Sequence, residues 1–130
     1  MIVLDASAVI ELVLGSPRGA TVHARIQRRD ESLHAPHLLD VEVASVLRRY
    51  QLSGALSSED GRDALADLAG LDIVRYPHDP LLPRVWELRT SVTVYDAVYL
   101  ALAEVLEAPL LTLDRRLARV RGHGARVEVP

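Results

Sequence analysis

Short runs of apolar residues alternate along the chain with longer stretches in which apolar positions recur every three or four residues. The short runs predict β-strands at residues 2–4, 32–35, 72–74 and 110–113, with a last strand at 126–129. Helical spacing predicts helices from Ala8 on, after a turn at 5–7, then over 17–29, 36–51, 57–71 and 95–106, through Trp86, and in the arginine-rich stretch after Asp114. Such alternation is typical of a three-layer α/β/α domain with a mainly parallel central sheet.

Composition narrows this picture further. A chain of 130 residues with 49% hydrophobic content suits one domain over residues 1–130 with a single core. The absence of cysteine excludes disulfides, thiolate metal sites and a cysteine nucleophile, and a reducing cytoplasm fits best.

The apolar opening of the chain is interpreted as part of the fold. It lacks a basic start and carries Asp5 and Glu11, so it predicts a strand and helix, with Ser7 as the helix N-cap, and no signal peptide. No charge-free apolar run approaches the length of about 18 residues that a membrane span needs.

The charge pattern is ambiguous by itself. The net charge of -3 gives no general attraction to nucleic acid, yet all 15 basic residues are arginine. Several of these arginines cluster: Arg25, Arg28 and Arg29; Arg48 and Arg49; and Arg115, Arg116, Arg119 and Arg121. Arginine forks can follow a phosphate backbone, but taken alone the clusters favour ordinary solvated helix faces encoded by a GC-rich genome.

Two aspartates directly follow predicted strands. Asp5 comes after the first apolar run and Asp114 after the run at 110–113. Ligands of parallel sheets bind outside the carboxyl ends of the strands, so both residues have the position of site residues. Each alone is equally well interpreted as a turn residue or a helix cap.

Two further carboxylates fall on apolar helix faces. Glu42 has leucine and valine neighbours one turn away, and Asp96 opens the most apolar predicted helix. An unpaired buried charge is costly, so such groups are usually paired or bound to metal. The alternatives are an ion pair between Glu42 and Arg49, and a capping role for Asp96 at its helix N-terminus.

Taken together, Asp5, Glu42, Asp96 and Asp114 offer an oxygen-only ligand set. Such ligands suit a hard cation, Mg²⁺ or Mn²⁺, rather than zinc or copper. Clustered carboxylates also repel one another unless a cation neutralises them. The residues therefore predict a hard-metal site.

Four segments of the chain resemble the PIN-domain ribonucleases, and in particular the VapC toxins of bacterial toxin–antitoxin pairs. They are Ile-Val-Leu-Asp-Ala-Ser-Ala at 2–8, the stretch 36–49 containing Glu42, Tyr-Asp-Ala-Val-Tyr-Leu-Ala-Leu-Ala at 95–103 and Leu-Thr-Leu-Asp-Arg-Arg-Leu at 111–117. In this order they cover nearly the whole chain, and the segment at 95–103 is the most specific.

The resemblance implies a single PIN-like domain and a set of site residues. Asp5, Glu42, Asp96 and Asp114 carry over as the metal-binding and catalytic carboxylates, with Ser7 and Thr112 as supporting hydroxyls. Some relatives place another acidic residue just beyond the last aspartate, where this chain has Arg115 and Arg116. That departure leaves open whether one or two metal ions bind.

The function expected from the resemblance is that of the toxin of a toxin–antitoxin system, a Mg²⁺- or Mn²⁺-dependent endoribonuclease that hydrolyses RNA phosphodiester bonds. A bound divalent cation would lower the pKa of a water molecule that attacks phosphorus. Candidates for holding the RNA backbone are Arg48, Arg49, Arg115 and Arg116. The resemblance also implies a homodimer and a VapB-like antitoxin partner.

Two competing functions are weaker. A phosphatase of the haloacid dehalogenase type needs a second aspartate where this chain has Ser7, and a lysine that the chain lacks altogether. A non-catalytic binding module is disfavoured because all four carboxylates are retained. The five histidines show no ligand spacing, and a histidine general base of the pancreatic-ribonuclease type has no support.

Overall fold

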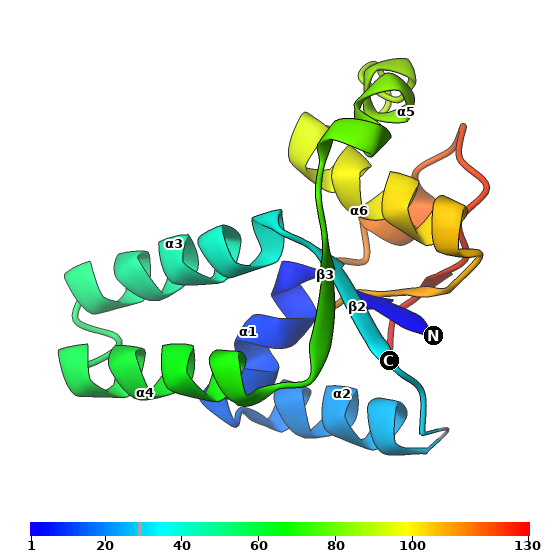
Figure 1. The fold of residues 1–130 in the computed structure, drawn as a ribbon. Helices are drawn as coiled ribbons and strands as arrows, with labels where there is room; N and C mark the ends of the chain where they lie inside the picture. Colours follow the sequence, from blue (N-terminus) through cyan, green and yellow to red (C-terminus); the bar gives the residue numbers. More distant parts are fainter. Residues whose placement is uncertain (29) are drawn as a thin grey trace.

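The computed structural model describes residues 1–28 and 30–130, which form a sheet with helices on both faces (Figure 1). Its strands are β1 (Ile2–Leu4), β2 (Leu33–Pro36), β3 (Ile73–Tyr76), β4 (Leu110–Leu111) and β5 (Val127–Glu128). Their order is β3-β2-β1-β4-β5, and each neighbouring pair is parallel. The three-layer α/β/α prediction is confirmed, with a sheet that is wholly parallel in the described residues.

The helices divide into two groups, one on each face of the sheet. They are α1 (Ala6–Leu14), α2 (Pro17–Gln27), α3 (Leu38–Leu52), α4 (Ser58–Gly70), α5 (Leu82–Glu87) and α6 (Val94–Leu106), with the 3₁₀ turns η1 (Asp79–Leu81) and η2 (Leu117–Arg119). Figure 1 shows α1 to α4 on one side of the strands and α5 and α6 on the other. The predicted helix at 17–29 is confirmed as far as Gln27, and Arg29 lies outside the described residues.

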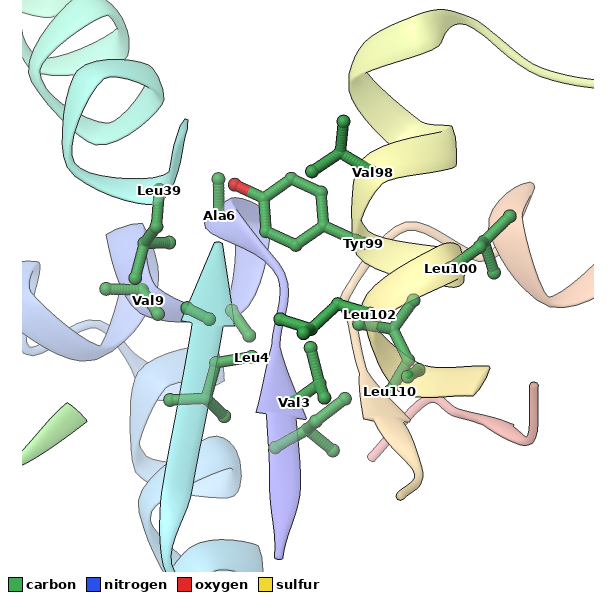
Figure 2. Packing of buried hydrophobic residues seen from close by; sticks show 14 of the residues in the cluster. Val3, Leu4, Ala6, Val9, Leu39, Val98, Tyr99, Leu100, Leu102 and Leu110 are labelled. Carbon is green, nitrogen blue, oxygen red and sulfur yellow. The ribbon is translucent and has the colours of Figure 1, made fainter. Parts of the chain in front are cut away.

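The core is built around β1, the middle strand. All three of its residues are fully buried, as expected for a strand with a neighbour on each side and helices over both faces. From α6, residues 97–103 are all buried, which explains why this helix is so apolar, and Tyr99 extends from it toward the strands (Figure 2). None of the described helices combines the length and hydropathy needed to cross a membrane.

The chain after β4 differs from its prediction. The strand ends at Leu111 rather than at residue 113, and the expected arginine-rich helix is only the short turn η2. The Asp114 carboxylate accepts a hydrogen bond from the Arg116 backbone N–H over 2.9 Å, and the Asp114 carbonyl accepts one from Leu117. These local bonds hold a tight turn and compete with regular helix.

The start of α1 also differs from its prediction. Asp5, not Ser7, occupies the N-cap position in an extended conformation, and its side chain makes no capping bond. The helix begins earlier than expected because β1 runs into it with no intervening loop. Pro36 likewise ends β2 instead of opening α3, and the next backbone N–H, that of His37, bonds the Tyr76 carbonyl over 2.8 Å.

Candidate active site

The site lies where the strand order reverses direction. From β1 the sheet continues to β2 and β3 on one side and to β4 on the other. The chain leaves β1 at Asp5 and leaves β4 at Thr112, and the Asp5 N–H bonds the Leu111 carbonyl over 3.0 Å. The carboxyl ends of these two parallel strands are therefore adjacent, the arrangement in which open α/β sheets bind ligands.

Asp5 is held by the two hydroxyls that the sequence singled out. Ser7 Oγ and Thr112 Oγ1 each donate to Asp5 Oδ2 over 2.7 Å. Thr112 is fully buried, and Asp5 is only 7% exposed. Because both bonds reach Oδ2, the other carboxylate oxygen receives no hydrogen bond from the described residues and is left for another ligand. The same two hydroxyls also accept from the backbone N–H groups of Leu113 and Asp114.

All four predicted carboxylates line one hollow of about 380 Å³, which we call the acid hollow. Asp5 and Asp114 enter it from the strand ends, Glu42 from α3 and Asp96 from the first turn of α6. Its other lining residues are Ala6, Ser7, Ile10, Glu11, Arg18, Val46, Arg49, Tyr50 and Leu113. The fold thus brings together residues that are scattered over most of the sequence.

Glu42 has the most unfavourable surroundings of the four. Its Oε1 atom is buried without a hydrogen-bond partner, and the structure shows no ion pair between Glu42 and Arg49. Burial raises the pKa of Glu42, the charges of Asp5 and Asp96 raise it further, and the nearby Tyr99 hydroxyl opposes the change. Glu42 is therefore a carboxylate that a cation would stabilise.

Tyr99 is a site neighbour that sequence reasoning passed over as core. Its ring is 1% exposed and extends from α6 toward the carboxyl end of β1 (Figure 2). The Tyr99 hydroxyl is also buried and has no hydrogen-bond partner among the described residues. Burial and the neighbouring Glu42 raise its pKa. Tyr99 follows Asp96 by three residues, a spacing that places both side chains on one face of a helix. This spacing was the available signal in the sequence.

Asp96 is not the cap of α6, contrary to the alternative weighed above. Thr93 caps the helix by accepting the Asp96 N–H over 3.2 Å. The position of Asp96 in the first turn favours a charged carboxylate. Nevertheless burial, followed by the charges of Asp5 and Asp114, raises the pKa of Asp96. Burial and the two neighbouring charges together outweigh the opposing effects of Thr93 and Arg116 on this pKa.

Asp114 differs from the other three because it has a cation of its own. Arg116 Nη2 contacts Asp114 Oδ2 at 2.8 Å and Arg116 Nε contacts Oδ1 at 3.1 Å. These bonds, with the Arg116 backbone N–H, hold the pKa of Asp114 below its usual range. The Arg116 side chain, 87% exposed, reaches back over the aspartate rather than pointing freely into solvent.

The oxygen ligands that the four carboxylates offer suit a hard divalent cation. In the structure their side chains are not arranged around a single point. In the described residues no three acidic or histidine side chains are arranged as metal ligands. Asp5 is directed in part to its hydroxyls, and Asp114 to Arg116. An ion that gathers the carboxylates must therefore draw Asp114 away from Arg116. The unpartnered Glu42 oxygen and the repulsion raising two pKa values both favour binding.

The predicted arginines fall in different places. Arg49 lines the acid hollow. Arg48 is exposed on α3 and does not line it. Arg115 lines a separate hollow with Arg18. Sequence reasoning missed Arg18, which also lines the acid hollow and donates to the Leu113 carbonyl over 3.2 Å. Arg18 lies on α2, outside the four segments that carry the site carboxylates, so no sequence motif identifies it.

Comparison with known proteins agrees with this geometry. The PIN domain family matches residues 2–123. Ribonuclease VapC12 of Mycobacterium tuberculosis is 43% identical over 129 residues, which cover 99% of this chain and 98% of that protein. Ribonuclease VapC1 of the same organism is 47% identical over 121 residues, covering 92% and 90%.

A solved structure shares the fold at low sequence identity. In the VapBC2 complex of Rickettsia felis, bound to a DNA fragment from its promoter, one chain superposes with a TM-score of 0.74 at 14% identity. The match covers 99% of this chain and 98% of that chain. On the family match and the two relatives that extend over nearly their whole length, the chain belongs to the PIN-domain family and, within it, to the VapC ribonucleases.

Proposed function

We propose that the protein is a Mg²⁺- or Mn²⁺-dependent endoribonuclease that hydrolyses RNA phosphodiester bonds with Asp5, Glu42, Asp96 and Asp114. The observation that carries the proposal is the convergence of these four carboxylates on one hollow, where burial and mutual repulsion raise the pKa of two of them. Membership of the VapC ribonucleases supports RNA as the substrate.

The residues divide the work of the site between them. A bound divalent cation would polarise the scissile phosphate and lower the pKa of the attacking water. Ser7 and Thr112 fix Asp5 so that its second oxygen faces the hollow. Glu42 and Asp96 have raised pKa values, which suits whichever is less engaged as a ligand to accept the proton of the water.

Substrate binding is assigned to the arginines that line the site. Arg49 and Arg18 line the acid hollow, and Arg116 stands beside Asp114. We propose that these three contact RNA phosphates, with Arg115 at the next hollow. Arg48 has no comparable position and is left out of this group.

The partners are part of the same proposal. The Rickettsia felis relative of this fold was solved as a VapBC complex, which supports a VapB-like antitoxin as the partner of this chain. We propose a cytoplasmic location, because the cellular RNA that is its proposed substrate is found there. We also propose a homodimer, which light scattering on the purified protein would test directly.

The experiment is cleavage of a short labelled RNA by the purified protein. Cleavage should require added Mg²⁺ or Mn²⁺, stop in excess EDTA, and fall by at least about 100-fold in Asp5→Asn and Asp96→Asn. Asp60→Asn is the matched control, since Asp60 holds the same position in α4, with its N–H bonded to the capping Ser57 hydroxyl, but lies far from the acid hollow.

Two results would overturn the proposal. One is cleavage that persists in excess EDTA. The other is an Asp96→Asn variant that cleaves as fast as Asp60→Asn, because the carboxylate cluster would then be dispensable.

A further inference from the structure

A second hollow, which we call the side hollow, adjoins the acid hollow and shares Asp96 and Asp114 with it. Its volume of about 530 Å³ is within the range of small-ligand sites. It is lined by Arg89, Thr90, Ser91, Val92, Thr93, Asp96, Asp114, Arg116, Leu117 and Val120. These residues come from the connection between α5 and α6, the first turn of α6 and the turn before and within η2.

Arg89 is fixed in position on one wall of the side hollow. Its guanidinium carbon lies 4.5 Å from the centroid of the Trp86 ring, and its Nη1 atom donates to the Trp86 carbonyl over 2.7 Å. The cation–π contact and the hydrogen bond limit the rotamers of an otherwise exposed arginine. A guanidinium has five N–H donors, so most remain available to a ligand. Arg89 is thus prepared to bind without ordering a flexible side chain.

The remaining lining of the side hollow is mixed. Thr90, Ser91 and Thr93 contribute hydroxyls, Arg116 pairs with Asp114, and Val92, Leu117 and Val120 add apolar surface. Two arginines and three hydroxyls match the phosphate and the ribose of a nucleotide, and the apolar residues suit its base. This combination favours a nucleotide over an apolar peptide, which would leave the arginines without a counter-charge.

We propose that the side hollow binds the nucleotide adjoining the scissile phosphate, with Arg89 holding that nucleotide's own phosphate. This inference rests on the proposed function, because only an RNA strand that enters the acid hollow would continue into its neighbour. Trp86 then acts as a positioning residue that holds Arg89. The sequence offered no motif for this site, since Trp86 and Arg89 are one helical turn apart in a segment interpreted as ordinary helix.

The chain provides its own reporter for a test. Trp86 is the sole tryptophan, is 64% exposed and contacts Arg89, so the protein's tryptophan fluorescence reports on the surroundings of this pair. The Asp5→Asn variant prevents cleavage without changing a residue that lines this hollow. In that background, a short single-stranded RNA should quench or shift Trp86 fluorescence saturably, at the same concentrations that saturate the anisotropy of the labelled RNA.

Variants separate this contact from general charge. Adding Arg89→Gln should weaken RNA binding by about tenfold, since one charge-assisted phosphate contact is lost. Arg62→Gln makes the same change of charge at an exposed position on α4 that lines neither hollow, and should stay within about twofold. Trp86→Leu should weaken binding less than Arg89→Gln, because it loosens the arginine without removing it.

Three outcomes would overturn the inference. The first is RNA binding, seen by anisotropy, with no change in Trp86 fluorescence. The second is equal loss in Arg89→Gln and Arg62→Gln, which would reduce the effect to net charge. The third is a Trp86 signal that depends on protein concentration without RNA, which would assign the ring to self-association. Metal-dependent cleavage by the wild-type protein is measured separately, so the side hollow can fail while the proposed function stands.

Discussion

The Thr112 hydroxyl donates a hydrogen bond of 2.7 Å to the Asp5 carboxylate, joining residues 107 positions apart at the ends of adjacent strands. Thr112 is fully buried and also accepts the Asp114 N–H. We predict that Thr112→Val lowers the free energy of unfolding by about 1–3 kcal/mol, because Asp5 loses one of its two hydroxyl donors and the Asp114 N–H loses its acceptor. Urea denaturation measures this change.

The control for this prediction is Thr112→Ser, which keeps the hydroxyl and loses one methyl group. It should retain most of the stability that Thr112→Val loses. Equal losses in the two variants would show that packing, rather than the hydroxyl, is what Thr112 contributes.

Repulsion between the clustered carboxylates should lower the measured stability of the metal-free protein. The folded protein raises the pKa of Asp96, so it binds a proton more readily than the unfolded chain does, and metal-free stability falls as pH rises through that folded-state pKa. At pH 7 the repulsion is fully present. We predict that metal-free Asp96→Asn melts at or above the wild-type temperature at pH 7, and that its advantage shrinks as pH falls through the raised folded-state pKa and the wild-type carboxyl takes up its proton.

Asp60→Asn is again the matched control for the melting experiment. Its carboxylate is exposed in the first turn of α4, so its loss removes a favourable helix-terminus interaction and should lower stability by a few tenths of a kcal/mol, up to about 1 kcal/mol. A drop in Asp96→Asn as large as in Asp60→Asn would contradict the prediction.

Arg116 should compete with metal for Asp114. Because the guanidinium contacts both carboxylate oxygens, an ion that binds Asp114 must displace it. We predict that Arg116→Gln tightens Mn²⁺ binding by about two- to fivefold, the modest effect expected on removing an exposed competing ion pair. Calorimetric titration in the absence of RNA measures this affinity.

Arg119→Gln is the appropriate comparison for metal binding. Arg119 is exposed at the end of η2, and lines neither the acid hollow nor the side hollow. If both variants tighten Mn²⁺ binding equally, the effect comes from net charge and the contact with Asp114 is not the cause.

A buried histidine makes stability sensitive to mild acid. His34 is 6% exposed, and its ring nitrogens contact Ser32 Oγ at 2.8 Å and the Tyr76 hydroxyl at 2.7 Å. Burial lowers the pKa of His34, so the unfolded chain takes up the proton first as pH falls. We predict that stability is lost as pH drops below about 6.5, the ordinary histidine pKa, toward the lower folded-state pKa.

The pH dependence is measured as urea midpoints of the wild type and of His34→Gln between pH 8 and pH 5. Replacing His34 should remove this component of the slope, whereas His23→Gln, at an exposed position on α2, should keep it. An unchanged slope in His34→Gln would assign the acid sensitivity to other groups.

The sequence predicted best the parts of the molecule that a periodic apolar pattern determines. β1 and the central residues 97–103 of α6 are buried, and the bounds of both elements match the prediction to within one residue. The four carboxylates could be proposed because strand ends and apolar helix faces are visible in a sequence. The turn after Asp114 could not, since side-chain bonds to nearby backbone decide it and they leave no periodic pattern.

Arginine positions were the other feature that the sequence left open. Neighbours in sequence, such as Arg48 and Arg49, point to different surroundings once they are on a helix. Arg18 and Arg89 reach the two hollows from separate elements, and only the packing of α2 and the connection between α5 and α6 places them there. Long flexible side chains carry little information about their contacts in sequence alone.

β1 lies in the middle of the sheet, but its neighbour β4 comes near the end of the chain. The parts of the acidic centre that follow these two strands are therefore synthesised at different times. A ribosome releases Asp5 early, but β4 and Thr112 emerge only near the end of synthesis, about 5 to 20 s later at ordinary elongation rates. Until then the first carboxylate lacks the Thr112 hydroxyl and β1 lacks β4 beside it. On the proposed function, a growing or prematurely terminated chain has no complete nuclease centre and cannot attack the RNA of the machinery that is making it.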